Sequence, residues 1–353
     1  MRVNLVAVQT RLELERYRSF AAFRSAMSSL AQKACRTADP RLPSILVFPE
    51  GLGLFLSLAP YYYEMMSGAA TVTSAIWRVG LRKWPSLLLT AARYRTAGLR
   101  TALLEHGLEA REAYFDTFAE IARQEGVYIV GGTGFFPDVV KRPLKRPRVA
   151  GREVSNVAPL FAASGTLLLQ SRKLNRASRW ERRFAFAEGR GEELYPAQTA
   201  AGRIGVLVCH DSLRERNLER LDALGTEVLA VPAYNLAPWL STVRGTQITQ
   251  EAAWLDRGLP RLIAGRENIQ YAVCSMLVGS IFDLRSEGRS FICQNSGEAS
   301  RPPVVALASS FAEEEVVVAQ VELGTRALLN TESHLALDSV LRHPRRDIPL
   351  RVN

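Results

Sequence analysis

Short apolar runs typical of buried β-strands alternate with helical patterns along most of this 353-residue chain. The strand-like runs are residues 5–9, 44–48, 127–132, 156–161, 166–170, 204–209, 228–231, 272–278, 290–293 and 315–321. The clearest helical patterns are 15–33 and 109–124. This alternation, without a break in composition or an internal repeat, predicts one domain in which helices cover β-sheets.

Composition and chain start indicate a protein of the cytoplasm. Hydrophobic residues make up 47% and charged residues 23% of the chain, which is ordinary for a globular protein. The N-terminus is a strand pattern and not a secretory signal, and no apolar run reaches the roughly eighteen residues of a spanning helix. The cysteines, at positions 35, 209, 274 and 293, show neither metal-site spacing nor a disulfide framework. We therefore expect free thiols in a reducing compartment.

The formal net charge of +10 indicates an anionic partner. An acidic substrate or an anionic membrane surface would fit this excess. The usual nucleic-acid-binding motifs are not found in the sequence, so we expect no nucleic-acid partner.

Chemically reactive side chains follow three of the strand-like runs. Cys209 ends the run from Ile204, Glu50 comes after 44–48, and Lys173 comes after 166–170. Each has an ordinary alternative, because free cysteine commonly packs as a small hydrophobe and strand-end Glu or Lys is commonly solvated. Glu181, eight residues after Lys173, is either a fourth member of the group or an exposed residue of a charged helix. A thiol with a nearby base and cation is what nucleophilic catalysis requires.

The segments around these residues resemble the nitrilase superfamily of carbon–nitrogen hydrolases. The resemblance covers roughly residues 1–325, which would form one carbon–nitrogen hydrolase domain. It runs through Val47-Phe48-Pro49-Glu50, Arg172-Lys173 and Cys209-His210-Asp211, and through residues 6–9, 155–158, 164–166, 186–189, 202–206, 231–233 and 266–268. It implies a four-layer α-β-β-α sandwich, and a homodimer as the usual assembly.

The same resemblance implies a role for each reactive residue. Glu50 would be the general base, Lys173 the cation beside the tetrahedral oxyanion, and Cys209 the nucleophile. Glu181 stands where many members place a second glutamate that orients the lysine or the substrate. The backbone N–H of His210 would complete the oxyanion hole. Such chemistry needs no metal and no cofactor, and the four histidines are too scattered to suggest a metal site.

Three side chains are candidates for substrate binding. His210 stands where the family more often has Tyr or Trp, and it either bonds within its turn or lines the leaving-group side. Tyr234 and Asn235 follow the strand end 231–233, and they either line the pocket or form a plain turn. The Trp-Glu pair that follows the nucleophile in true nitrilases is absent, which favours an amide over a nitrile.

A helical, basic insertion is expected at about residues 53–110, because the gap between Glu50 and Val127 is longer than the family usually has. Residues 65–104 include six Lys or Arg and no Asp or Glu. Trp77, Leu81 and Trp84 would form one apolar helix face, which Pro85 then interrupts. The segment is either a lid that contacts an anionic membrane or a helical insertion packed on the enzyme with solvated arginines.

Two other segments are expected to lie outside the regular elements. Residues 141–148 are basic and carry two prolines, which predicts a solvated linker between strands. Residues 326–353 would form a C-terminal tail that contacts a neighbouring surface or a partner subunit.

Three functions remain open at this stage. The first is a cytoplasmic hydrolase of an amide-type, non-peptide C–N bond that works through a cysteine acyl-enzyme. The second is a peripheral membrane amidase or N-acyltransferase acting on a lipophilic acyl substrate beneath the insertion. The third is a binding protein without catalysis, which the intact Glu, Lys and Cys argue against.

Overall fold

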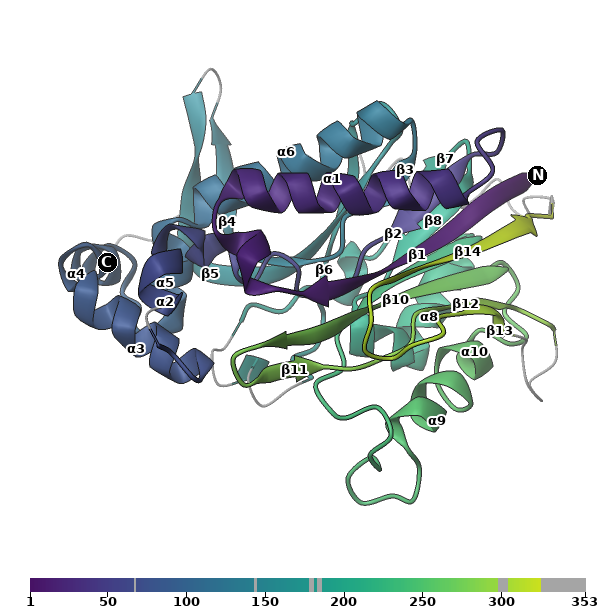
Figure 1. Ribbon diagram of the computed structural model, residues 1–353. Helices are drawn as coiled ribbons and strands as arrows, with labels where there is room; N and C mark the ends of the chain where they lie inside the picture. The colour runs from purple at the N-terminus through teal and green to yellow at the C-terminus, as the bar shows by residue number, and fades with distance from the viewer. Residues whose placement is uncertain (67, 143–144, 178–180, 183–185, 298–303, 325–353) are drawn as a thin grey trace. The chain divides into compact units, whose positions relative to one another are not determined.

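Two β-sheets pack face to face, and helices cover their outer sides (Figure 1). The computed structural model describes residues 1–66, 68–142, 145–177, 181–182, 186–297 and 304–324. The four layers are the α-β-β-α arrangement that the sequence predicted.

The first sheet is built around β1 (Arg2–Leu12). β1 pairs in parallel with β2 (Ser44–Val47) and antiparallel with β14 (Glu315–Glu322). The sheet continues through β3 (Tyr128–Val130), β4 (Gly134–Arg142), β5 (Lys145–Phe161) and β6 (Leu167–Arg172). Side chains of β1 alternate between two cores, because successive residues of a strand point to opposite faces. Leu5 and Ala7 join the core shared with the second sheet, and Val6 and Val8 join the core under the helices.

The second sheet is centred on β9 (Val228–Ala233) and β10 (Tyr271–Ile281), which run in parallel. Its other strands are β7 (Ala197–Thr199), β8 (Gly202–Val206), β11 (Leu284–Ser286), β12 (Phe291–Gln294) and β13 (Val304–Leu307). The last residues of β1, from Thr10 to Leu12, pair in parallel with the stretch from Leu277 to Gly279 of β10. β1 therefore belongs to both sheets and fixes their relative position.

The helices that cover the first sheet are longer than those that cover the second. α1 (Phe20–Thr37) and α6 (Gly107–Glu125) pack on the first sheet through large aromatic side chains, among them Phe23, Tyr114 and Phe118. Shorter helices accompany the second sheet: α8 (Glu215–Ala223), α9 (Gln250–Leu255) and α10 (Leu259–Leu262). Ser19 caps α1, so that this helix starts later than the pattern 15–33 predicted.

Two sequence predictions need correction. The strand predicted at 204–209 ends at Val206, and Cys209 opens the 3₁₀ turn η4 (Cys209–Leu213). Residues 141–148 are not a linker, since all but 143–144 belong to the β4–β5 hairpin. Pro147 is tolerated there because it lies at a shift in the strand register, where the ladder needs no N–H donor.

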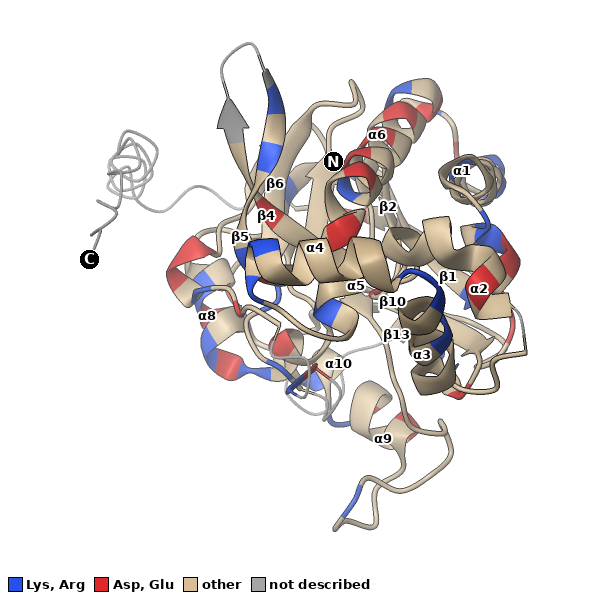
Figure 2. Cartoon of the chain, turned by 90° about the vertical axis from the view of Figure 1, so that its left-hand side faces the viewer, with Lys and Arg blue, Asp and Glu red and all other residues tan. Residues whose placement is uncertain are grey.

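The segment predicted as a basic insertion, about residues 53–110, forms a series of short helices. It comprises η2 (Leu56–Tyr61), α2 (Tyr62–Met66), α3 (Val72–Arg82), α4 (Trp84–Tyr94) and α5 (Leu99–Glu105), which face the viewer in Figure 2. Trp84 does not share a helix with Trp77 and Leu81, because α3 ends at Arg82. Pro85 lies in the first turn of α4, where a missing N–H costs nothing.

No helix among the described residues is both long and apolar enough to cross a membrane. The C-terminal tail predicted at 326–353 lies outside the described residues.

Candidate active site

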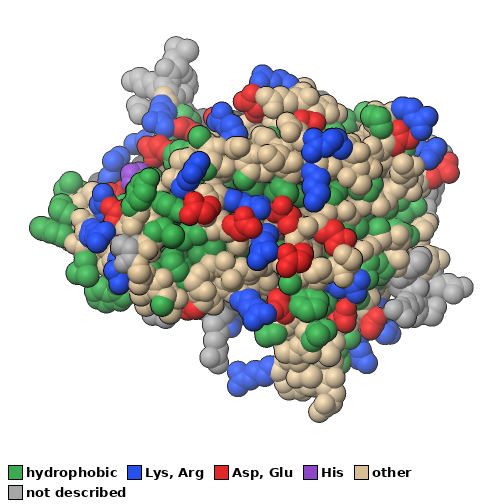
Figure 3. Space-filling view, in the orientation of Figure 1, with side chains coloured by type: hydrophobic (Ala, Val, Ile, Leu, Met, Phe, Trp, Pro, Cys, Tyr) green, Lys and Arg blue, Asp and Glu red, His purple; other side chains and the backbone are tan. Residues whose placement is uncertain are grey.

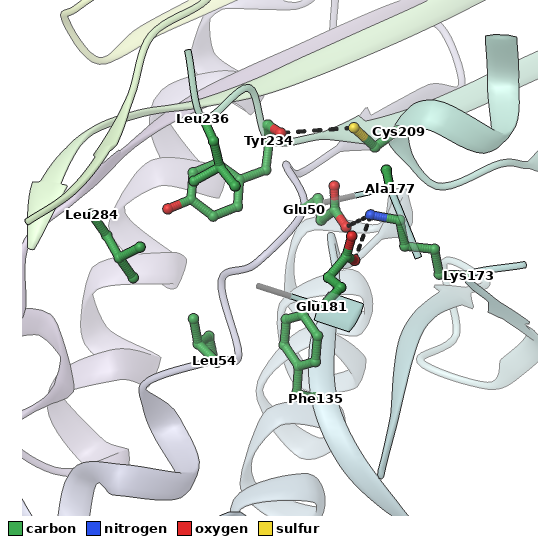
Figure 4. A pocket seen from close by; sticks show the side chains of 10 residues that line it. All are labelled: Glu50, Leu54, Phe135, Lys173, Ala177, Glu181, Cys209, Tyr234, Leu236 and Leu284. Atoms are coloured by element: carbon green, nitrogen blue, oxygen red, sulfur yellow. Dashed lines mark hydrogen bonds and ion pairs between the residues drawn. The ribbon is translucent and has the colours of Figure 1, made fainter. Parts of the chain in front are cut away.

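A small pocket opens where three loops leave the carboxyl ends of their strands. Glu50 follows β2, Lys173 follows β6, and Cys209 comes three residues after β8. These residues and Glu181 line a pocket of about 60 Å³ (Figure 4). The remaining lining residues are apolar or aromatic: Leu54, Phe135, Ala177, Tyr234, Leu236 and Leu284.

Lys173 lies between two carboxylates. Its Nζ donates to Glu50 Oε1 at 2.8 Å and to Glu181 Oε1 at 2.7 Å, and all three side chains are buried. Asn156 Nδ2 donates to the same Glu50 oxygen at 2.7 Å. The buried ammonium and carboxylates thus satisfy one another, as buried charges must.

The electrostatics of the cluster keep the lysine charged. Burial by itself would lower the pKa of Lys173, but the charges of Glu50, Cys209 and Glu181 outweigh this and raise it. Burial raises the pKa of Glu50, and Lys173 only partly opposes that effect. A raised pKa makes Glu50 a stronger base than a solvated glutamate.

Cys209 faces this cluster from a strained backbone position. Its φ of +50° lies in the left-handed region, which non-glycine residues rarely adopt and which is found most often at functional sites. Its Sγ lies 3.7 Å from the carbonyl oxygen of Tyr234. Burial, followed by the negative charge of Glu50, raises the pKa of the thiol. The resting sulfur is therefore protonated, and a neighbouring base must take its proton before it attacks.

The loops that carry these groups are tied to one another by Asp211. Its carboxylate accepts hydrogen bonds from the backbone N–H of Leu174 at 2.7 Å, and from the N–H and side-chain amide of Asn175 at 3.1 and 2.8 Å. The turn that begins at Cys209 is thereby fastened to the loop that follows Lys173. Sequence reasoning did not assign Asp211 or Asn156 to the site. The sequence feature that could have indicated Asp211 is a carboxylate only two residues after the expected nucleophile.

The three predicted substrate-binding residues are placed differently from one another. Tyr234 lines the pocket, and its buried hydroxyl has no hydrogen-bond partner among the described residues. Asn235 points away and donates to the backbone oxygens of Ala237 and Glu287 at 2.9 and 3.0 Å. His210 is half-buried and is not among the residues that line the pocket. Burial lowers the pKa of its imidazole, which is therefore neutral near pH 7.

Comparison with known proteins shows the family of this chain. The family model described as carbon–nitrogen hydrolase matches residues 58–329, well over half of the chain. A curated bromoxynil-specific nitrilase from Klebsiella pneumoniae subsp. ozaenae is 38% identical over 79 residues. That match spans 22% of this chain and only 22% of the relative.

Solved structures share the fold over nearly the whole chain. A carbon–nitrogen hydrolase from Helicobacter pylori G27 is 17% identical with a TM-score of 0.61, covering 98% of this chain and 95% of that one. A double mutant of the amidase from Nesterenkonia sp. AN1, in complex with acrylamide, is 14% identical with a TM-score of 0.57, covering 96% and 97%. Nit3 of Saccharomyces cerevisiae, a member of the nitrilase superfamily, is 14% identical with a TM-score of 0.55, covering 100% and 96%.

Proposed function

This chain belongs to the carbon–nitrogen hydrolase family of the nitrilase superfamily, and we propose that it hydrolyses an amide C–N bond through a thioester on Cys209. The proposal is supported chiefly by one observation. The Cys209 thiol lines the same small pocket as a buried lysine that lies within 2.8 Å of two carboxylates.

In the first half of the reaction, Glu50 accepts the thiol proton as Sγ attacks the carbonyl carbon of the amide. The negative charge that develops on the substrate oxygen lies beside Lys173 Nζ and the backbone N–H of His210. A preorganised donor of this kind typically contributes about 10²–10³ in rate. Glu50 then returns its proton to the nitrogen, the C–N bond breaks, and an amine or ammonia leaves.

In the second half, a water molecule enters the space that the amine has left. Glu50 takes a proton from this water as its oxygen attacks the thioester carbon. The C–S bond breaks, the sulfur recovers the proton from Glu50, and a carboxylic acid is released. Glu181 positions Lys173 through both halves by accepting a second hydrogen bond from its ammonium group.

The test is to trap the thioester with an activated acyl donor. A p-nitrophenyl ester has a leaving group that needs no proton, so the parent protein should be acylated faster than it deacylates, and acid quenching should preserve the thioester. Glu50→Gln, which lacks the base for the thiol proton, should be acylated far more slowly. Intact-protein mass spectrometry should then find one acyl group on Cys209. Cys209→Ala should acquire none, and Cys35→Ser, which changes a cysteine outside the pocket, should behave as the parent protein.

Two results would count against the proposal. An acyl group on a residue other than Cys209 would assign the nucleophile elsewhere. Steady hydrolysis of butyramide by Cys209→Ala would exclude the thioester route. A nitrile with the same carbon skeleton as the amide serves as the comparison substrate, and we expect the amide to be preferred.

A further inference from the structure

The helices of the insertion line a second and larger cavity of about 590 Å³, which is open on one side. We call it the α3–α5 chamber. Among the described residues that line it, all are apolar or glycine except three threonines and Asp283. The Asp283 carboxylate accepts the backbone N–H of Val72 at 2.7 Å, and the hydroxyls of Thr96 and Thr101 bond to each other at 3.0 Å. The chamber therefore presents a hydrocarbon-like interior of the size that small-molecule sites usually have.

The chamber adjoins the catalytic pocket. Leu284 lines both cavities. Leu54 of the catalytic pocket lies two residues before η2, and Leu58 of the chamber lies within η2. In Figure 4, Leu54 and Leu284 lie on the side of the pocket away from Lys173. The two cavities thus share an apolar wall at Leu284.

The outer wall of the chamber is exposed and apolar. Trp77, Trp84 and Leu88 line the chamber, yet they are 68%, 59% and 57% exposed. Leu81 and Leu89 add further exposed surface beside them, and hydrophobic side chains gather at this end of the molecule in Figure 3. α4 has no buried residue at all. A short helix gains most of its stability from packing, so we expect another apolar surface to cover this one.

The charge of the same segment indicates what covers it. Residues 65–104 carry six basic and no acidic side chains, and Arg82, Arg93 and Arg95 are exposed around the apolar surface. Basic residues beside exposed Trp and Leu match the interface of an anionic bilayer, where aromatic rings lie at the level of the headgroups.

We propose that this surface docks on an anionic membrane and that the α3–α5 chamber holds the long aliphatic acyl chain of an amide drawn from it. The proposal rests on the amidase function above and names its substrate class. The chain lies in the chamber, passes Leu284, and presents its carbonyl carbon to Cys209. The bond that breaks is the C–N bond already described, so the chemistry is unchanged.

Chain-length preference tests the chamber. Acetyl, butyryl, octanoyl and palmitoyl p-nitroanilides should show kcat/KM rising by about tenfold or more from butyryl to octanoyl, because each buried methylene favours binding. Gly80 lines the chamber, and a Cβ built there meets no atom within 4 Å. Gly80→Phe should therefore fold and should abolish the rise in kcat/KM from butyryl to octanoyl substrates. Gly151→Phe, also open but on β5, is the matched control.

Vesicle flotation tests the docking surface. The full-length protein should float with phosphatidylcholine vesicles that contain phosphatidylglycerol, and much less with phosphatidylcholine alone. Leu81→Glu/Leu89→Glu should lose this binding yet keep full activity on the acetyl substrate. Leu240→Glu/Val305→Glu changes two other exposed apolar side chains and should bind as the parent protein does.

Each outcome decides one part of the inference. Equal kcat/KM for butyryl and octanoyl substrates, with hydrolysis still dependent on Cys209, overturns the acyl chamber and leaves the amidase function intact. Loss of dependence on Cys209 overturns the amidase function itself. If the parent protein ignores anionic vesicles and Leu81→Glu/Leu89→Glu converts a dimer to monomers, the surface joins two copies and the membrane is excluded.

Discussion

Replacement of Lys173 by methionine removes the charge at the centre of the buried cluster while nearly keeping the side-chain length. Nζ lies 2.8 Å from Glu50 Oε1 and 2.7 Å from Glu181 Oε1, so these oxygens are at most 5.5 Å apart, the two distances added together. At an effective dielectric constant of about 20, each attraction is worth about 6 kcal/mol and the repulsion at least about 3 kcal/mol. The variant loses both attractions and keeps the repulsion.

Part of this loss is offset, because the variant no longer has to bury an ammonium group. Removing one partner of a buried pair typically costs about 3–5 kcal/mol, and we expect the free energy of unfolding at neutral pH to fall by this amount. Acidification should restore part of it. Without the lysine, the pKa of the Glu50 carboxyl is higher in the folded than in the unfolded chain. The folded state therefore binds more protons and gains stability as pH falls. Urea denaturation at neutral and acidic pH measures both effects.

The same variant separates stability from catalysis. kcat/KM on an amide should fall by about 10²–10³ with the lost oxyanion donor. Lys173→Met/Glu181→Gln should regain stability at neutral pH without regaining activity, and Lys33→Met on the surface of α1 should change neither. If Lys173→Met unfolds at the same urea concentration as the parent protein at neutral pH, the charge argument is wrong. A kcat/KM near that of the parent protein would remove Lys173 from the mechanism.

Three more changes have defined outcomes. The pKa that governs the acid limb of the kcat/KM profile should lie above the ordinary pKa range of glutamate, because burial raises the pKa of Glu50 and only its ionised form accepts the thiol proton. Glu50→Gln should abolish this limb. A limb that survives in this variant belongs to another group. Asp211→Ala should lower the free energy of unfolding by about 1–3 kcal/mol in urea titrations and should also lower kcat/KM, because three donors, the N–H of Leu174 buried and both groups of Asn175 partly buried, lose their acceptor. Unchanged kcat/KM would show that these hydrogen bonds do not position Cys209. Gly132→Ala should lower Tm far more than Gly126→Ala. Both glycines have positive φ, but only at Gly132 would an added Cβ lie 2.2 Å from the oxygen of Pro49. Equal losses of Tm would mean that backbone strain explains the whole effect and that the contact with Pro49 contributes nothing.

The parts of the site that the sequence predicted share one property. Glu50, Lys173 and Cys209 each follow a strand-like run closely, and such positions converge at the ends of packed sheets whatever the details of packing. The four-layer fold was predicted by its resemblance to a family, and it is confirmed.

The parts that the sequence did not predict depend on contacts between distant segments. Asn156 reaches Glu50 across 106 positions of sequence, and no local pattern marks such a pair. Whether Tyr234 or Asn235 would face the pocket depended on where the turn after β9 begins, and a shift of one residue exchanges the two. The sequence did not predict the chamber either, because an apolar face on one helix does not show the space that three short helices leave between them.

The protonated state of Cys209 has a consequence for how the protein survives oxidants. Peroxides and simple alkylating agents react with thiolates, and a sulfur that keeps its proton at rest offers them little. It becomes nucleophilic only when a carbonyl carbon in the pocket draws the proton toward Glu50. The thiol is therefore reactive only while a carbonyl compound occupies the pocket. Inhibitors that contain a carbonyl group should inactivate the protein at concentrations at which general thiol reagents leave Cys209 unmodified.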